Sequence, residues 1–167
     1  MKKISALVLI GICFCSCLAH AQTAIGKSTI DGDGLLDFAT GSVKGIILPA
    51  VSSLPATPAN GTFLFDRNDM KLKMYSNNQW VDLSDEGDTA DLLPFNGANI
   101  NSQSVIGAES TNVEGALVLE SDEKALVLPK VASPHLNVPS PYPGMMCYDT
   151  DAKALAVFDG AVWNYWK

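Results

Sequence analysis

Beyond its first 21 residues, the sequence is poor in the residue types on which catalysis and metal binding most often depend. It contains one cysteine, Cys147, one histidine, His135, and one arginine, Arg67. A single cysteine excludes an intramolecular disulfide and a cysteine-based metal cluster in this part of the chain. A catalytic triad would need His135 beside a serine and an acid, and the sequence has no Gly-x-Ser-x-Gly motif. We therefore expect no enzymatic activity, with no catalytic, cofactor-binding or metal-binding residues and no cofactor.

Cys147 lies in the short apolar run Met145-Met146-Cys147-Tyr148, which is typical of a strand. A cysteine in such a run behaves as a small buried hydrophobic residue rather than as a reactive thiol. We interpret it as a core residue.

A hydrophobic segment opens the chain. Lys2 and Lys3 precede an apolar run over residues 4–18, and Ala19-His20-Ala21 supplies small residues at the positions that a signal peptidase reads. This pattern predicts a signal peptide over residues 1–21 with cleavage before Gln22, and hence a protein that is secreted or held at the outer cell surface. The run is shorter than the roughly 20 residues of a transmembrane helix. A less favoured alternative is a lipoprotein signal with lipid anchoring at Cys17, although the leucine usual three positions earlier is missing.

Basic residues are scarce. The whole chain has 11 Lys and Arg against 18 Asp and Glu, a net charge of −7. Removal of Lys2 and Lys3 with the leader leaves 11 − 2 = 9 basic residues and a net charge of −9. Nucleic acid is therefore an unsuitable partner, because phosphate binding requires clustered Lys and Arg.

Against these absences stands an internal duplication. Residues 44–82 resemble residues 124–166, first at an offset of 80 and then, after a three-residue insertion, at an offset of 83. The matched pairs are Pro49 and Pro129, Val51 and Val131, Gly61 and Gly144, Phe65 and Tyr148, Asp66 and Asp149, Leu72 and Leu155, Tyr75 and Phe158, and Trp80 and Trp163. The similarity extends upstream, where Ile25-Gly26 matches Ile106-Gly107. A repeat of this length indicates two copies of one structural unit.

These boundaries predict four segments: a signal peptide over 1–21, a first β-repeat unit over 22–83, a linker over 84–105 and a second β-repeat unit over 106–167. Each unit is small enough to be marginal alone, because short chains bury too little surface. We therefore expect the units to pack on each other or on other chains.

Within each unit the patterns are those of short strands. Residues 45–48 and 125–128 are apolar and end before a proline, which predicts short buried strands. The proline-rich segments that follow predict extended connections, not helices. Gly61 and Gly144 then begin hairpins, and alternation along residues 70–75 places Leu72 and Met74 inside with Lys71, Lys73 and Tyr75 outside. The predicted fold is all-β, with two duplicated small antiparallel meander or hairpin units after the signal peptide.

The arrangement of Lys44-Gly45, Pro49, Gly61, Phe65-Asp66, Tyr75 and Trp80, repeated as Lys124-Ala125, Pro129, Gly144, Tyr148-Asp149-Thr150, Phe158, Gly160 and Trp163, resembles a known repeat. It is similar to a β-repeat of secreted and cell-surface proteins of Bacteroidota and to head regions of phage tail-fibre-like proteins. The resemblance implies a structural, adhesion or assembly role at the bacterial surface, with a homo-oligomer such as a trimer as one partner arrangement. This chain departs from the repeat in having a shorter spacer after Leu-Pro.

Aromatic residues near the end of each unit are the candidates for contact. Tyr165 and Trp166 have no counterparts in the first copy, where Asp82 and Leu83 stand, so they are predicted to touch a ligand or an interface, together with Tyr75. Trp80 and Trp163 recur at one register, which favours a place in the core. The sequence thus predicts a secreted, non-catalytic structural, adhesion or assembly module. The alternative is a carbohydrate-binding module that uses exposed aromatics.

For Tyr165 and Trp166 themselves, a simpler structural role is also open, in which the two side chains cover the last strand. The protein or glycan partner is not specified by these patterns.

Overall fold

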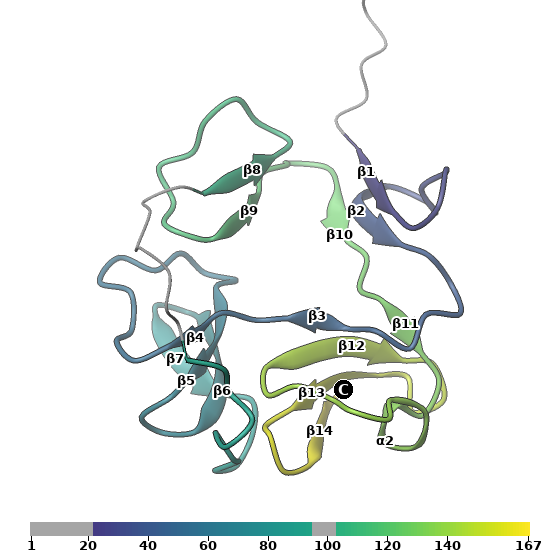
Figure 1. Cartoon of the computed structure of the whole chain (residues 1–167). Helices are drawn as coiled ribbons and strands as arrows, with labels where there is room; N and C mark the ends of the chain where they lie inside the picture. The colour runs from purple at the N-terminus through teal and green to yellow at the C-terminus, as the bar shows by residue number, and fades with distance from the viewer. Residues whose placement is uncertain (1–21, 95–102) are drawn as a thin grey trace, which may run out of the picture.

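The computed structural model describes residues 22–94 and 103–167, so the predicted signal peptide and Cys17 lie outside the described residues. The described chain is mostly β (Figure 1). The first half contains β1 (Thr23–Ile25), β2 (Gly34–Phe38), β3 (Ile46–Ile47), β4 (Ala50–Val51), β5 (Phe63–Asp66), β6 (Lys71–Ser76) and β7 (Gln79–Asp82). The second half contains β8 (Ser104–Ile106), β9 (Leu117–Leu119), β10 (Ala125–Leu126), β11 (Lys130–Val131), α2 (Pro134–Asn137), β12 (Met145–Asp149), β13 (Ala154–Phe158) and β14 (Trp163–Trp166).

The duplication read from the sequence recurs in the strand pairing. β5, β6 and β7 form an antiparallel meander in which Phe63 is paired with Met74, and β12, β13 and β14 repeat it with Met146 paired with Val157. Both registers are related by the offset of 83 found in the sequence. The two halves therefore carry the same seven strands in the same order.

Half of the strand pairs are parallel, which the antiparallel interpretation of the sequence did not include. β1 pairs parallel with β2, β4 with β5, β8 with β9, β11 with β12 and β10 with β2. A parallel pair needs a long connection, because the chain must return from the end of one strand to the level at which that strand began. The proline-rich and glycine-rich segments supply these connections, and the chain coils in the manner of a β-solenoid. The predicted meanders account for only the second part of each unit.

One connection that was expected to be extended contains a helical turn. α2 begins at Pro134, a position where the missing N–H of proline costs nothing. Ser133 precedes it in the left-handed region with φ of 43°. The second unit's connection is thereby folded over one face of the sheet formed by β12 and β13, and its own Val138, directly after α2, is buried against residues of that sheet.

Two hydrophobic clusters hold these sheets. The larger one spans both units and contains Leu48, Phe65, Leu72, Leu83, Leu92, Met146 and Val157. The smaller one belongs to the second unit and contains Val131, Val138, Met145, Cys147, Ala156 and Phe158. Cys147 is 0 % exposed, which confirms its interpretation as a core residue.

Other burial predictions were wrong in an informative way. The strands β3 and β10 were expected to be buried, but Ile47 is 52 % exposed and Leu126 is 37 % exposed. Each is a two-residue strand that crosses from one unit to a sheet of the other, so only part of its surface is covered. Trp80 and Trp163 are half-buried rather than buried, and they pack against Tyr75 and Phe158 with ring centroids 5.2 and 5.5 Å apart.

The end of the first unit and the beginning of the segment predicted as a linker both contact the second unit closely. The N–H of Asp88 donates to the carbonyl of Asp159 over 3.0 Å. A Cβ atom on Gly87 would lie 2.1 Å from the Asp159 oxygen, and one on Gly160, where φ is 101°, would lie 1.9 Å from the Asp88 oxygen. Only glycine permits this approach. The indole Nε1 of Trp166 also donates to the Leu83 carbonyl over 2.7 Å.

Candidate functional site

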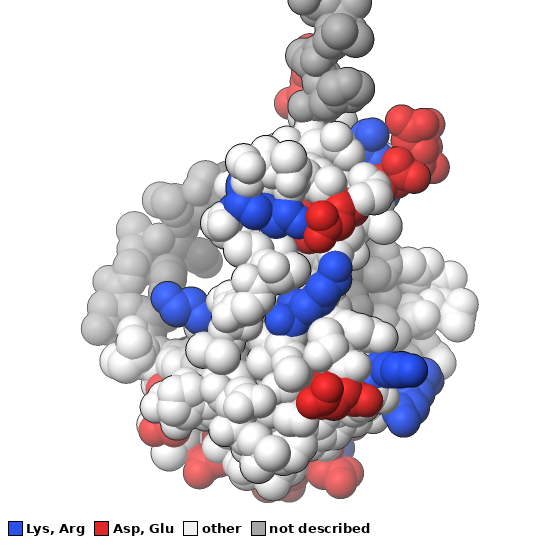
Figure 2. Space-filling view, turned by 90° about the vertical axis from the view of Figure 1, so that its right-hand side faces the viewer, with Lys and Arg blue, Asp and Glu red and all other residues white. Residues whose placement is uncertain are grey.

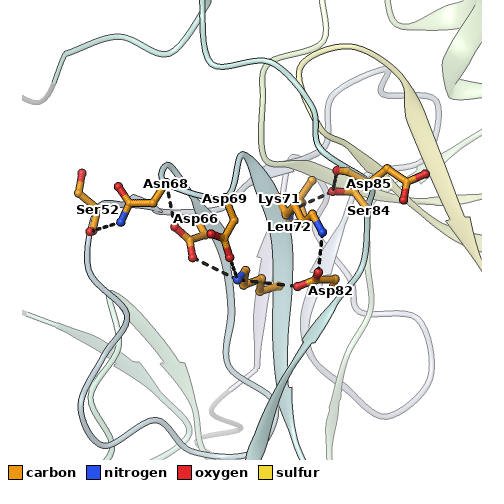
Figure 3. A network of polar contacts seen from close by, with 10 residues as sticks. Ser52, Asp66, Asn68, Asp69, Lys71, Leu72, Asp82, Ser84 and Asp85 are labelled. Carbon is orange, nitrogen blue, oxygen red and sulfur yellow. Dashed lines mark hydrogen bonds and ion pairs between the residues drawn. The ribbon is translucent and has the colours of Figure 1, made fainter.

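The face of the first meander that points away from the larger hydrophobic cluster carries a buried cation. The Lys73 side chain is 9 % exposed, and its Nζ lies 3.3 Å from Asp66, 3.8 Å from Asp82 and against Asp69. Figure 3 shows the three carboxylates converging from β5, from the turn after it and from β7. Strand alternation had placed Lys73 on a solvent-exposed face, which is wrong because the carboxylates of neighbouring strands cover it.

The ionised forms of these groups are favoured by one another. Burial raises the pKa of Asp66, but the Asn68 N–H and the Lys73 ammonium outweigh that effect and leave this pKa below its ordinary value. Burial lowers the pKa of Lys73, and its bonds to Asp69 and Asp66 reverse the effect and raise it. Asp66 and Lys73 are therefore both ionised at neutral pH.

The second unit lacks a lysine at the corresponding position. Ala156 stands where the first unit has Lys73, Ala152 where it has Asp69, and Tyr165 where it has Asp82. These replacements, with α2 and its flanking loop, leave an open hollow of about 740 Å³. Its lining includes His135, Val138, Asp149, Ala152, Trp163 and Tyr165.

Asp149 organises the wall of this hollow. One of its carboxylate oxygens, Oδ1, accepts hydrogen bonds from the N–H groups of Ser133, Asp151 and Ala152, at 3.1, 2.8 and 3.1 Å. Burial raises the pKa of Asp149, but these donors outweigh it and hold the pKa below the ordinary value. The same carboxylate fixes both the turn after β12 and the entry into α2. Its role is therefore to hold the loop, not to react.

The three residues predicted to make contacts lie in different surroundings. Tyr165 is 39 % exposed at the hollow, and its hydroxyl lies 3.1 Å from His135 Nδ1. Its pKa is raised, chiefly by the partial burial of the phenol group. Trp166 is 43 % exposed, and its indole N–H is already bound to the first unit. Tyr75 is half-buried on β6 and packs edge-to-face on Trp80. The structure thus associates Tyr165 with a hollow and places neither Trp166 nor Tyr75 in that hollow.

Sequence reasoning did not single out Lys73, Asp149 or the part played by His135. The duplication contained a usable signal for the first two. Asp66 and Asp149 match between the copies, whereas Lys73 is matched by Ala156, which marks one shared structural acid and one charge present in a single unit.

The chemistry available at these sites is limited. Within residues 22–94 and 103–167, no group of three or more His, Cys, Asp and Glu side chains could hold a metal ion. Burial, followed by the charge of Asp149, raises the pKa of the Cys147 thiol to about 12, so it is not a nucleophile at neutral pH.

On the face in Figure 2, positive and negative side chains form small separate groups in a largely uncharged surface. No helix among the described residues has the length and apolar character needed to cross a membrane.

Comparison with known proteins adds one finding. Residues 105–167 match the family model described as a phage tail like trimerisation region. The match coincides with the second unit, and the first unit, which has the same strand order, lies outside it. Neither the curated proteins nor the solved structures compared with the chain include a match.

Proposed function

We propose that this protein is a non-catalytic structural module that assembles as a homotrimer and serves adhesion or assembly at the bacterial cell surface. The observation that carries the proposal is the match of the second unit to a trimerisation region. The β-solenoid character of the chain supports it, because such folds present long edges and faces to neighbouring copies.

Surface hydrophobicity supports association with other chains. Four aliphatic side chains on short strands are strongly exposed in the single chain: Ile25 at 49 %, Ile47 at 52 %, Leu117 at 47 % and Leu126 at 37 %. The unpaired edges of short strands can pair with another chain, which would cover such residues.

The test of assembly is the mass of residues 22–167 in solution, measured by multi-angle light scattering over a range of concentrations. A stable mass of three chains is expected. A single-chain mass at every concentration would contradict the trimer, since the family match would then describe shape without assembly.

Export is the second part of the proposal and depends on the leader. Mass spectrometry of protein purified from expressing bacteria should give a mature N-terminus at Gln22. An acylated N-terminus at Cys17 would replace simple secretion by lipid anchoring. Protein recovered in the cytoplasm with residues 1–21 intact would contradict both.

Carbohydrate binding is a second candidate function, favoured by the open hollow with Tyr165 at its wall. Aromatic faces at a hollow are suited to stacking on sugar rings. Binding to a glycan array should be lost in Tyr165→Ala and retained in Tyr148→Ala, a tyrosine of similar exposure, 37 %, that does not line the hollow. Equal binding by both variants, or no binding by the unmodified protein, would exclude this function for the hollow.

A further inference from the structure

Each unit contributes one short strand to a sheet of the other unit. β3 of the first unit joins the sheet of β11 to β14 in the second unit, and β10 of the second unit joins the sheet of β1 and β2 in the first. β3 and β10 are the same segment in the two copies. The sheets that receive them, however, are not equivalent (Figure 1). Among residues 22–94 and 103–167, no strand occupies the position on the sheet of β4 to β7 that β3 occupies on its counterpart. Nor, in the same ranges, does one occupy the position on the sheet of β8 and β9 that β10 occupies beside β2.

β3 and β10 use opposite edges of the duplicated segment. In β10, the N–H groups of Ala125 and Val127 donate to Asp33 and Leu36, so the odd-numbered residues face β2. In β3, the N–H of Leu48, which corresponds to Leu128, donates to Gly144 beside β12. Because the edge of a strand alternates from residue to residue, Leu126 and Leu128 present their N–H groups on the side of β10 away from β2. One segment can therefore bind both kinds of sheet at once.

The unfilled edge of β5 is open at the corresponding place. The N–H of Phe65 and that of Arg67 donate to the carbonyls of Pro49 and Val51, so Phe63 faces the same side, beyond the end of β4. Around Gly144, a Cβ atom would meet the Leu48 backbone within 3.4 Å. Around Gly61, its counterpart, nothing lies within 4 Å. No residue of the described part of the chain therefore takes, beside Gly61, the position that Leu48 takes beside Gly144.

From these contacts we infer that residues 126–128 of a second copy of this chain pair antiparallel with residues 61–63 of the first. The known pairs of β3 with β12, Met145 with Ile47 and Met146 with Ile46, fix the register. The offsets of 80 and 83 convert them to Thr62 with Val127 and Phe63 with Leu126. The Leu128 N–H then donates to the Gly61 carbonyl. This inference rests on the proposed trimer and names the contact that forms it.

The exchange is head-to-tail, since each copy offers one segment and receives another at a different place. Such a contact closes into a ring when the rotation between copies is a whole fraction of a turn. The same rule fills the open edge of β9. Conversion of the pair Leu126 and Leu36 places Ile46 of another copy opposite Leu117, and the Ile47 N–H would donate to the Leu117 carbonyl. Leu117 is 47 % exposed in the single chain.

One difference between the copies limits the length of the ladder. A Cβ atom on Gly45 would lie 2.6 Å from the Met146 carbonyl oxygen, and the corresponding residue of β10 is Ala125. With alanine at this position, the intermolecular pairing cannot include residue 125. The intermolecular pairing therefore covers residues 126–128.

The test is a disulfide between Thr62→Cys and Val127→Cys in residues 22–167 with Cys147→Ala. These two positions form a pair without mutual hydrogen bonds, which brings their Cα atoms to about 4.5 Å, a distance that a disulfide spans. The matched control is Met145→Cys with Ile47→Cys, the equivalent pair within one chain. On non-reducing gels, we expect the first variant to run as covalent dimers and trimers and the control as a monomer. A mixture of the two single variants, Thr62→Cys and Val127→Cys, should give dimers only.

The outcomes separate the inference from the proposed function. A single-chain band with an internal 62–127 disulfide would overturn the inference, because β10 would then fold back on its own β5. A trimer by light scattering without the 62–127 cross-link would also overturn it while leaving the trimer intact. A single-chain mass by light scattering would refute both.

Discussion

The two units share their strands and differ in what lies on the outer face of the meander. In the first unit this face carries Lys73 and its carboxylates, while in the second it carries Cys147, Ala156 and a second hydrophobic cluster beneath α2. The difference is repeated at the start of each unit. Lys27 is bound to Asp37 and Asp31 in the first, whereas Ala108, Val118 and Asn112 occupy these places in the second.

This comparison shows two ways to cover the same strands. The second unit has a longer connection, with three extra residues, that folds over the face and makes an apolar lining favourable. In the described residues of the first unit, Lys73 lies on this face instead, and its aliphatic stem covers the sheet while its ammonium group is paired with carboxylates. A fold that is repeated in sequence is therefore stabilised by different forces in its two copies.

The largest effect is expected for Asp149→Ala. It removes the charged acceptor of three part-buried N–H groups at the edge of the second cluster, and each such hydrogen bond contributes roughly 1 kcal/mol. Urea unfolding followed by tryptophan fluorescence should show a loss of about 3 kcal/mol. Asp149→Asn is the control, because it retains an acceptor oxygen at this position, and a loss equal to that of Asp149→Ala would contradict the explanation.

Lys73→Ala gives the first unit the residue of the second and leaves Asp66 buried without its cation. Removal of one partner of a buried ion pair costs several kcal/mol, and here we expect about 2 kcal/mol because Asp69 and Asp82 are half exposed. The free energy of unfolding is measured as for Asp149. Addition of Asp66→Asn to Lys73→Ala should recover part of the loss, and an equal or larger loss in the double variant would show that the charge of Asp66 is not the cause.

Acid should weaken the first unit through Asp37. The bond from Lys27, followed by that from the Asp31 N–H, lowers the pKa of Asp37 from 3.8 to about 2. A lowered folded-state pKa gives stability that is complete above the unfolded value and is lost as the pH falls from about 4 through about 2. Urea midpoints measured across this range should fall less steeply in Asp37→Asn. If the urea midpoint fell equally steeply with pH in both proteins, groups other than Asp37 would cause the acid sensitivity.

Much of the fold could be predicted because the relevant signals are local. The meanders follow from period-two patterns and from the turns at residues 66–69 and 149–152, and the duplication gave the order of the units. The parallel pairs could not be predicted, because alternation identifies a strand without identifying its neighbour. Lys73 was misplaced for a related reason: its burial depends on carboxylates from β5 and β7, which a pattern within β6 does not contain.

The aromatic residues at the candidate site also depend on contacts that the sequence pattern does not contain. Tyr165 was singled out because the first copy has Asp82 in its place, and that difference does coincide with the hollow. Trp166 was singled out by the same argument, but its indole N–H is bound within the chain. A difference between the copies locates a changed environment, and only the contacts tell whether that environment is open.

The smallest effect is expected for Tyr165→Phe, which removes only the hydroxyl that contacts His135. Both side chains are exposed, so water replaces the lost bond and stability should change by less than about 0.5 kcal/mol. Urea unfolding of this variant therefore provides a baseline for Asp149→Ala on the same wall of the hollow. A loss above 1 kcal/mol would show that the His135–Tyr165 contact supports α2.

The bond from Trp166 to the Leu83 carbonyl joins residues 83 positions apart, which is the repeat offset itself. Closing so long a loop carries an entropic cost that must be met before the bond adds stability, so contacts of this span form late in folding. The first meander can therefore form early from its own hairpins, while its junction with the second unit awaits β14. We expect refolding kinetics to separate these events, with Trp80 fluorescence changing before that of Trp166.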